Sequence, residues 1–321
     1  MTRSPRQFLF SLLFAFGLGL AFSEAAWSVR ETVEPSIDTV TTWTPNIWQA
    51  IVLGAVQGLT EFLPISSTAH LKVVPELLGW GDPGVSFTAA IQLGSIVAVV
   101  WYFWSDLVQV FRGSWQAIAK SDYDSPDFRI AFGIALGTLP IVAVGLLVKY
   151  VFLDFYESTV RGLGVIAIVS IVMAILLAFA EQMGKRERSF DRLNVRDGIL
   201  VGMAQMLALI PGVSRSGSTI TAALFLGLER ATAARFSFLL GIPAITLAGV
   251  LELKGAIEES GGAGGLPLLA GLISTVIFSY GAIAWLIRYL QTQNAWVFVW
   301  YRLAFGAAIL IGMGVGAFST Y

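Results

Sequence analysis

Residues 198–228 read GILVGMAQMLALIPGVSRSGSTITAALFLGL, and this stretch decides the fold class of the chain. Two apolar flanks surround a break of proline, glycine and serine at 211–217, and neither flank reaches the roughly 20 residues that a helix needs to cross a bilayer. A second stretch of the same character covers 47–80, where Pro64 and two serines interrupt the apolar run. Backbone groups in lipid must be paired within their own segment. Each stretch therefore predicts a helical hairpin that dips into the membrane and returns.

Composition places most of the chain in lipid. Of its 321 residues, 56% are hydrophobic and 13% are charged, which is about half the charged fraction of an ordinary soluble domain. A net charge of −1 gives no sign of nucleic-acid binding. The sequence contains no cysteine, which excludes thiolate catalysis and cysteine-based metal sites. We therefore expect an all-α polytopic membrane protein.

Apolar segments after each hairpin are long enough to span the membrane as helices. Three follow the first hairpin and three follow the second. They lie at about 86–105, 130–153, 159–180, 234–252, 266–288 and 297–319.

Loop charge predicts the orientation, because basic loops stay in the cytoplasm. Lysine and arginine residues place the loops at 106–129, 181–197 and 229–235 in the cytoplasm, while 253–265 holds Glu258 and Glu259 against Lys254 and fits outside. These assignments agree only if the two hairpins enter from opposite sides. The fold class is then an inverted-topology repeat, in which each half is a re-entrant helical hairpin plus three transmembrane helices.

The two hairpins also resemble each other in sequence. Gln57 precedes Ser66 by nine residues in the first, and Gln205 precedes Ser214 by nine in the second. Inverted repeats with broken helices place their polar sites near the midplane. We therefore expect the two breaks to form one site.

Residues 1–45 stand apart from this repeat. An apolar stretch at about 7–27 follows Arg3 and Arg6, a layout that suits a cleaved signal peptide or a membrane anchor equally. A polar linker follows it. The predicted domains are thus an N-terminal segment with its linker at 1–45 and a membrane domain at 46–321, which should carry any catalytic site.

Ionisable residues within a membrane are costly and are functional candidates by default. The first break supplies Glu61 and His70, and the second supplies Arg215. Gln57 shares a helix face with Glu61, since the two are four residues apart.

The second break also has the features of an anion site. A helix that begins near Ser216 would present free N–H groups and the positive end of its dipole. Arg215 adds a planar guanidinium suited to phosphate oxygens, and Ser214 and Thr219 add hydroxyls. Only Glu61 of the other hairpin, or a bound anion, would neutralise Arg215.

Structural alternatives stay open for each of these residues. Glu61 and Arg215 would also suit an ion pair between hairpins, and Gln57 and His70 would suit braces. Serines in membrane helices often serve helix packing. Broken helices alone do not distinguish an enzyme from a transporter.

At these residues the chain resembles the undecaprenyl-diphosphate phosphatase family, also called the bacitracin-resistance protein family. The matching motifs are QGLTEFLPISSTAH at 57–70 and PGVSRSGST at 211–219, supported by IQLGS at 91–95 and FSFLLGIP at 236–243. The resemblance covers about 46–321. In many members a second glutamate stands where this chain has Gln57.

The resemblance implies hydrolysis of undecaprenyl diphosphate to undecaprenyl phosphate and phosphate. This reaction recycles the lipid carrier of cell-wall synthesis and confers bacitracin resistance. It implies a multi-pass protein of the bacterial plasma (inner) membrane with its active site facing the extracytoplasmic side. It also implies a divalent cation, Mg²⁺ or Ca²⁺.

Site roles follow from the same motif match. Catalytic roles fall to Glu61, Ser67, His70 and Arg215. Binding of the substrate diphosphate falls to Ser66, Ser214, Arg215, Ser216 and Thr219. Metal binding falls to Glu61, with Gln57 as a candidate second ligand.

Several alternatives remain open from the sequence. The nucleophile is the Ser67 hydroxyl, water or His70, with Ser67 slightly favoured. A transporter or flippase for a polyprenyl phosphate or a small anion is the rival function. The membrane lipid phosphatases that use two histidines are disfavoured, because the chain has one histidine. The oligomeric state is unspecified.

Overall fold

The computed structural model of this protein describes residues 45–152, 155–259 and 265–318. Within these ranges the regular structure is helical, and no strand is present. The N-terminal segment and linker predicted at 1–45 lie outside the described residues apart from the last position.

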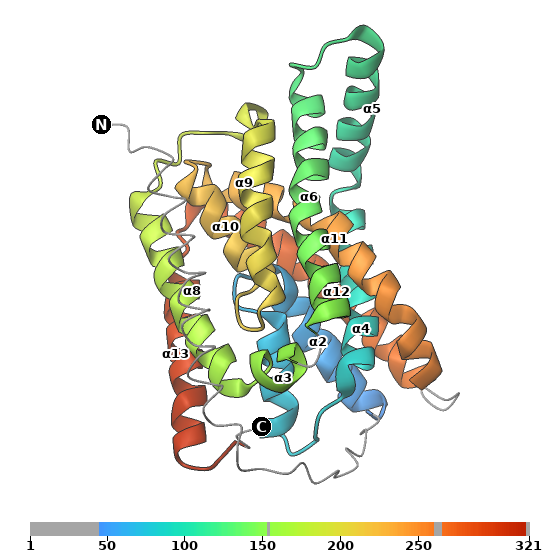
Figure 1. The fold of residues 1–321 in the computed structure, drawn as a ribbon, viewed down its shortest axis with the longest axis vertical. Coiled ribbons are helices and arrows are strands. Elements are labelled where there is room, and N and C mark those ends of the chain that lie inside the picture. The colour runs from blue at the N-terminus through green and yellow to red at the C-terminus, as the bar shows by residue number, and fades with distance from the viewer. Residues whose placement is uncertain (1–44, 153–154, 260–264, 319–321) are drawn as a thin grey trace. The chain divides into compact units, whose positions relative to one another are not determined.

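The helices follow the predicted order of a hairpin and then spans, twice (Figure 1). The first half contains α2 (Ile47–Phe62), α3 (Ser67–Leu77), α4 (Gly84–Tyr102), α5 (Trp104–Lys120), α6 (Pro126–Val151) and α8 (Leu163–Met183). The second half contains α9 (Val195–Met206), α10 (Arg215–Phe225), α11 (Arg230–Glu259), α12 (Gly265–Thr292) and α13 (Trp296–Gly314).

Long apolar helices confirm the prediction of a multi-pass membrane protein. Five of the described helices are long and apolar enough to cross a bilayer, namely α6, α8, α11 up to Val250, α12 and α13. A sixth candidate is the pair α4 and α5, which bends by 67° at a short break. All six predicted spans thus coincide with helices, while the opposite membrane orientation of the two halves stays a prediction.

Both hairpins begin with the same capping device. Asn46 accepts a hydrogen bond from the backbone of Gln49, whose side chain in turn accepts from the backbone of Asn46. Asn194 and Asp197 make the same reciprocal pair at the start of α9. Such a box satisfies N–H groups that the first helical turn leaves unpaired. The described structure therefore extends the sequence repeat to the start of both hairpins.

The first arm of each hairpin packs closely on a span of the other half. In α2, a Cβ on Gly54 would overlap the carbonyl oxygen of Gly271 in α12. In α9, a Cβ on Gly202 would overlap the carbonyl oxygen of Gly137 in α6. Small residues allow such close helix contacts in membranes, where van der Waals packing drives association. These two contacts hold the hairpins inside the bundle, with their tips near its centre (Figure 1).

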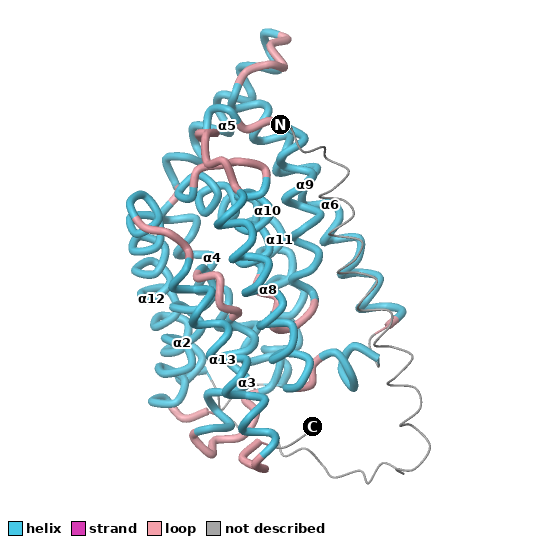
Figure 2. The backbone as a smooth tube through the Cα atoms, turned by 90° about the vertical axis from the view of Figure 1, so that its left-hand side faces the viewer, coloured by secondary structure: helices cyan, strands magenta, loops and turns pink. Residues whose placement is uncertain are grey.

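Helix α5 corrects one sequence-based expectation. The sequence predicts a cytoplasmic loop at 106–129, and α5 instead continues as a helix to Lys120. Its apolar side chains Phe111, Trp115 and Ile118 are exposed. An amphipathic helix of this kind suits the interface between headgroups and acyl chains. Figure 2 shows α5 at the same end of the described helices as the start of α9.

Candidate active site

The two breaks use the same backbone turn. Ser66 precedes α3 with φ of 74°, and Ser214 precedes α10 with φ of 70°. Residues other than glycine seldom adopt such angles, and they cluster at functional sites. Each turn presents the next residue at the first position of a helix. That residue is Ser67 in the first break and Arg215 in the second.

The prediction that the two breaks meet is confirmed. Ser216 donates its hydroxyl to the carbonyl of Leu63 at 2.9 Å. Nη2 of Arg215 lies 3.4 Å from Oε1 of Glu61. Residues about 150 positions apart in the chain therefore share one site.

Arg302 of α13 fastens the two breaks together. Its Nη1 donates to the carbonyls of Pro64 and Val213, both at 3.0 Å, and its Nη2 donates to Gly212 at 2.6 Å. Its Nε donates to the carbonyl of Ser170. The side chain is fully buried, at 1% exposure. The sequence analysis missed this residue, although an arginine inside a predicted span is itself a signal of function.

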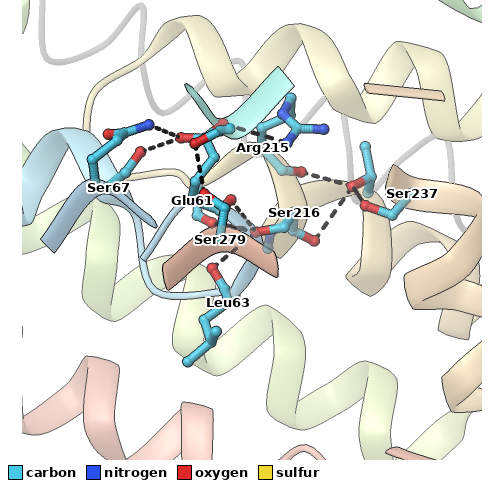
Figure 3. A network of polar contacts seen from close by, with 12 residues as sticks. Glu61, Leu63, Ser67, Arg215, Ser216, Ser237 and Ser279 are labelled. Carbon is cyan, nitrogen blue, oxygen red and sulfur yellow. Dashed lines mark hydrogen bonds and ion pairs between the residues drawn. The ribbon is translucent and has the colours of Figure 1, made fainter. Parts of the chain in front are cut away.

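Glu61 is the centre of the polar network in Figure 3. Its Oε2 accepts hydrogen bonds from the hydroxyl of Ser67 at 2.7 Å and from the amide of Gln57 at 3.0 Å. Its Oε1 faces Arg215. The carboxylate is buried, so these partners replace the water it would otherwise bind. A carboxylate that accepts from a hydroxyl is placed to take the proton of that hydroxyl.

Arg215 has unused hydrogen-bonding capacity. Its side chain is only 10% exposed, and its Nε and Nη1 have no hydrogen-bond partner among the described residues. Buried polar groups are rarely left unpaired, and an unpaired one requires an explanation. Glycine at 241 in α11 makes room for this guanidinium, because a Cβ there would overlap Nη1. The arrangement suits an anion that accepts from both free nitrogens.

A cavity of about 170 Å³ lies at the meeting point of the breaks. One part of its lining is polar: Glu61, Ser66, Ser67, Thr68, Gln92, Ser214 and Arg215. The other part consists of Ile141, Ala208, Ile210, Gly212, Ala244, Ile245 and Ala248. A site with these two parts suits a ligand with an anionic head and an apolar body.

Comparison with known proteins identifies the family. Residues 50–308 match the family described as bacitracin resistance protein BacA. The chain belongs to the BacA family. A protein of Trichodesmium erythraeum named undecaprenyl-diphosphatase is 62% identical over 84% of this chain and 86% of its own length. Proteins of the same name from Trichormus variabilis and Synechocystis sp. are 63% and 55% identical, the latter over 98% of this chain and 99% of its own length.

Not every residue of the BacA motifs lines the cavity. Ser66, Ser67, Ser214, Arg215 and Glu61 line it, whereas His70, Ser216 and Thr219 are absent from the lining of the described cavity. Gln92, from the supporting motif on α4, lines it although the motif analysis gave it no role.

His70 instead braces the first break against α13. Its Nδ1 lies 2.7 Å from the carbonyl of Ser66, so this nitrogen carries the proton and donates. Its Nε2 then accepts from the hydroxyl of Tyr301 at 2.6 Å. The ring also stacks on Phe305, with centroids 4.3 Å apart. Both nitrogens are therefore engaged in holding the turn that presents Ser67.

Ser216 and Thr219 hold the start of α10. The Thr219 hydroxyl contacts the carbonyl of Arg215 at 2.7 Å and the hydroxyl of Ser237 on α11 at 2.5 Å. Ser214 caps the helix through the N–H of Gly217. These contacts hold the backbone at the start of α10, where Arg215 stands, and the cap uses one of the N–H groups that the sequence suggested as an anion ligand.

A cation that the family resemblance implies has few protein ligands here. No group of three or more histidine, aspartate or glutamate side chains forms a metal cluster among the described residues. Glu61 is the one carboxylate in the cavity lining, beside the oxygens of Ser67 and Ser66. Mg²⁺ commonly binds one or two carboxylates plus substrate phosphates. The donors present fit a cation that arrives with a phosphorylated substrate.

Proposed function

We propose that this chain hydrolyses undecaprenyl diphosphate to undecaprenyl phosphate and phosphate, and that the cavity at Glu61 is its active site. The reaction recycles the lipid carrier used in cell-wall synthesis and so confers bacitracin resistance. The names of the relatives support the substrate. The observation that supports the proposal best is the Glu61 carboxylate, which accepts a hydrogen bond from the Ser67 hydroxyl and faces Arg215. Two nitrogens of Arg215 have no hydrogen-bond partner among the described residues.

Ser67 is the proposed nucleophile. Glu61 takes the hydroxyl proton while the Oγ attacks the terminal phosphorus. The bond from that phosphorus to the bridging oxygen breaks, and undecaprenyl phosphate leaves. Glu61 passes the proton it took to the departing oxygen and is again a carboxylate. It then takes a proton from a water whose oxygen attacks the phosphoserine phosphorus. The bond from that phosphorus to Oγ breaks, the proton returns from Glu61 to Oγ, and phosphate leaves. His70 is less suited to attack, because Tyr301 holds its Nε2.

Arg215 supplies electrostatic stabilisation in this scheme. Phosphoryl transfer depends mainly on positioning and on neutralising charge around the phosphorus. The free Nε and Nη1 donate to oxygens of the diphosphate, and the planar guanidinium contacts two of them at once. Glu61 limits the movement of this guanidinium through its Oε1. Glu61 and Arg215 come from different hairpins, so the packing of the helices sets the distance between them.

A divalent cation, Mg²⁺ or Ca²⁺, is the proposed cofactor. When bound, it neutralises charge on the diphosphate oxygens. Glu61 would hold it, with Gln57 nearby as a neutral neighbour that already donates to the same carboxylate.

We place the enzyme in the bacterial inner membrane with its site facing the extracytoplasmic side. The loop that follows α8 exposes Lys185 and Arg192, and the first turn of α9 exposes Arg196, as cytoplasmic segments do. Helix α11 begins beside this basic end at Arg230, while the exposed cavity residue Ala248 lies near the other end of the span. The cavity therefore reaches the surface away from the basic loops.

Phosphate release from a fifty-five-carbon prenyl diphosphate tests the proposal. We expect release by the purified protein, loss of release in excess EDTA, and recovery when Mg²⁺ or Ca²⁺ is restored. Glu61→Gln should abolish turnover and keep binding of the substrate. A protein that moves the lipid across a bilayer without releasing phosphate would instead be a transporter.

A further inference from the structure

We infer that one stripe of α11, made of Gly241, Ala244, Ile245 and Ala248, holds the first isoprene units of the substrate and guides the prenyl chain out of the active site. This inference rests on the proposed function, because it assigns the tail of the same substrate. It adds a binding surface for the apolar part, which the catalytic residues do not contact.

The stripe is continuous along one helix face. Its members stand at i, i+3, i+4 and i+7, which is the spacing of neighbours on the surface of an α-helix. Seven residues advance about 10 Å along the axis. Gly241 at one end is buried, Ala244 is half-buried, Ile245 is buried and Ala248 at the other end is exposed. The stripe therefore leads from the interior of the bundle to its surface.

The inner end of the stripe lies at the phosphate-binding group. A Cβ on Gly241 would overlap Nη1 of Arg215, and this nitrogen is one of the two that lack a partner among the described residues. The guanidinium is nine-tenths buried and lines the cavity. An anion bound to it therefore sits directly beside the start of the stripe.

The size of the cavity requires such an exit. Its volume of about 170 Å³ lies below the roughly 300–1,000 Å³ of pockets that hold drug-sized ligands. The space suits a diphosphate, whereas a chain of fifty-five carbons is far too large for it. Most of the chain must lie outside, and Ala248 both lines the cavity and is exposed.

The opposite wall of the apolar part comes from α6. Ile141 lines the cavity together with Ala244 and Ala248, and α6 packs against α11. Small side chains on α11 leave width for a branched isoprene unit beside Ile141. A large side chain at Ala248 would occupy that width and leave the polar part of the cavity as it is.

Binding in lipid nanodiscs tests the inference without turnover. The two probes are a non-hydrolysable methylene analogue of farnesyl diphosphate and methylenediphosphonate, which has the same head and no prenyl chain. Titration calorimetry gives the Kd of each probe for the wild type, Ala248→Phe and the smaller change Ala248→Leu. The matched control is Leu247→Phe, which adds an aromatic ring at the neighbouring exposed position outside the cavity lining.

We expect Ala248→Phe to raise the Kd of the farnesyl probe about tenfold, since lost burial of one apolar group is worth about that factor. The Kd of methylenediphosphonate should stay unchanged, and Leu247→Phe should change neither. Equal loss of both probes would overturn the inference, because the substitution would then act on the head-group site. Unchanged farnesyl binding in both Ala248 variants would also overturn it. Absence of phosphate release by a wild type that still binds as expected would refute only the proposed reaction.

Discussion

The hydroxyl of Ser67 lies 2.7 Å from Oε2 of Glu61, and the two residues stand on opposite sides of the break that separates α2 from α3. The turn at Ser66 brings them together, and His70 and Tyr301 hold that turn from the far side. The proposed nucleophile and its base are thus paired within one hairpin, while the group proposed to neutralise phosphate comes from the other.

Replacing Ser67 by alanine should lower kcat by at least about 10²-fold, because positioned proton transfer and a covalent intermediate are lost together. Substrate binding should be retained. Phosphate release measured under single-turnover conditions, with mass spectrometry for phosphoserine in the wild type, checks the assignment. Wild-type turnover in Ser67→Ala would transfer the nucleophile role to water.

Arg215→Lys should lower kcat on the order of 10²-fold, because lysine keeps the charge and lacks the planar fork that contacts two oxygens. Thermal stability in detergent should remain close to that of the wild type. If lysine supports near-normal turnover with unchanged stability, Arg215 serves only as a counter-ion for Glu61.

Gly241→Ala should lower kcat/KM by about tenfold or more, since its Cβ would overlap Nη1 of Arg215 and displace the guanidinium by an ångström or so. Gly281→Ala on α12 is the matched control, because a Cβ there meets no atom within 4 Å. The control should keep full activity, and alanine should slightly stabilise the helix. Equal activity of the two variants would mean that Arg215 has room to adjust.

Arg302→Leu should destabilise the bundle, because carbonyls at Pro64, Gly212 and Val213 lose their donor. Each buried acceptor left unpaired costs about 1–3 kcal/mol. Arg302→Lys should recover part of this loss, since an ammonium reaches fewer of the carbonyls. Thermal unfolding in detergent compares the variants. A leucine variant as stable as the wild type would contradict the role of Arg302 in holding the two breaks together.

Hydropathy and loop charge predicted the order of the helices. Both depend only on which residues lie in lipid and which lie in water, and this can be read directly from the sequence. They missed α5, since its apolar residues Phe111 and Trp115 are spaced for an interface and do not form a continuous run. The loop charges implied that the two hairpins enter the membrane from opposite sides, and this inverted arrangement predicted that the two breaks meet. The contact between Glu61 and Arg215 confirms that they do.

The spacing of two residues along a helix did not predict which other helix each side chain contacts. Ser67 and His70 are three residues apart, yet the first lines the cavity and the second contacts Tyr301 on α13. Arg302 and Gly241 act through elements that pack on the breaks, so only the folded chain reveals their contacts.

The paired turns at Ser66 and Ser214 have one further consequence. The same backbone shape presents Ser67 in one copy and Arg215 in the other, so the symmetry of the scaffold is not matched by symmetry of chemistry. Neither half alone contains both groups. The two copies of the turn therefore depend on each other. A substitution that moves one turn is tolerated only if Ser67 and Arg215 still face each other at the centre of the bundle.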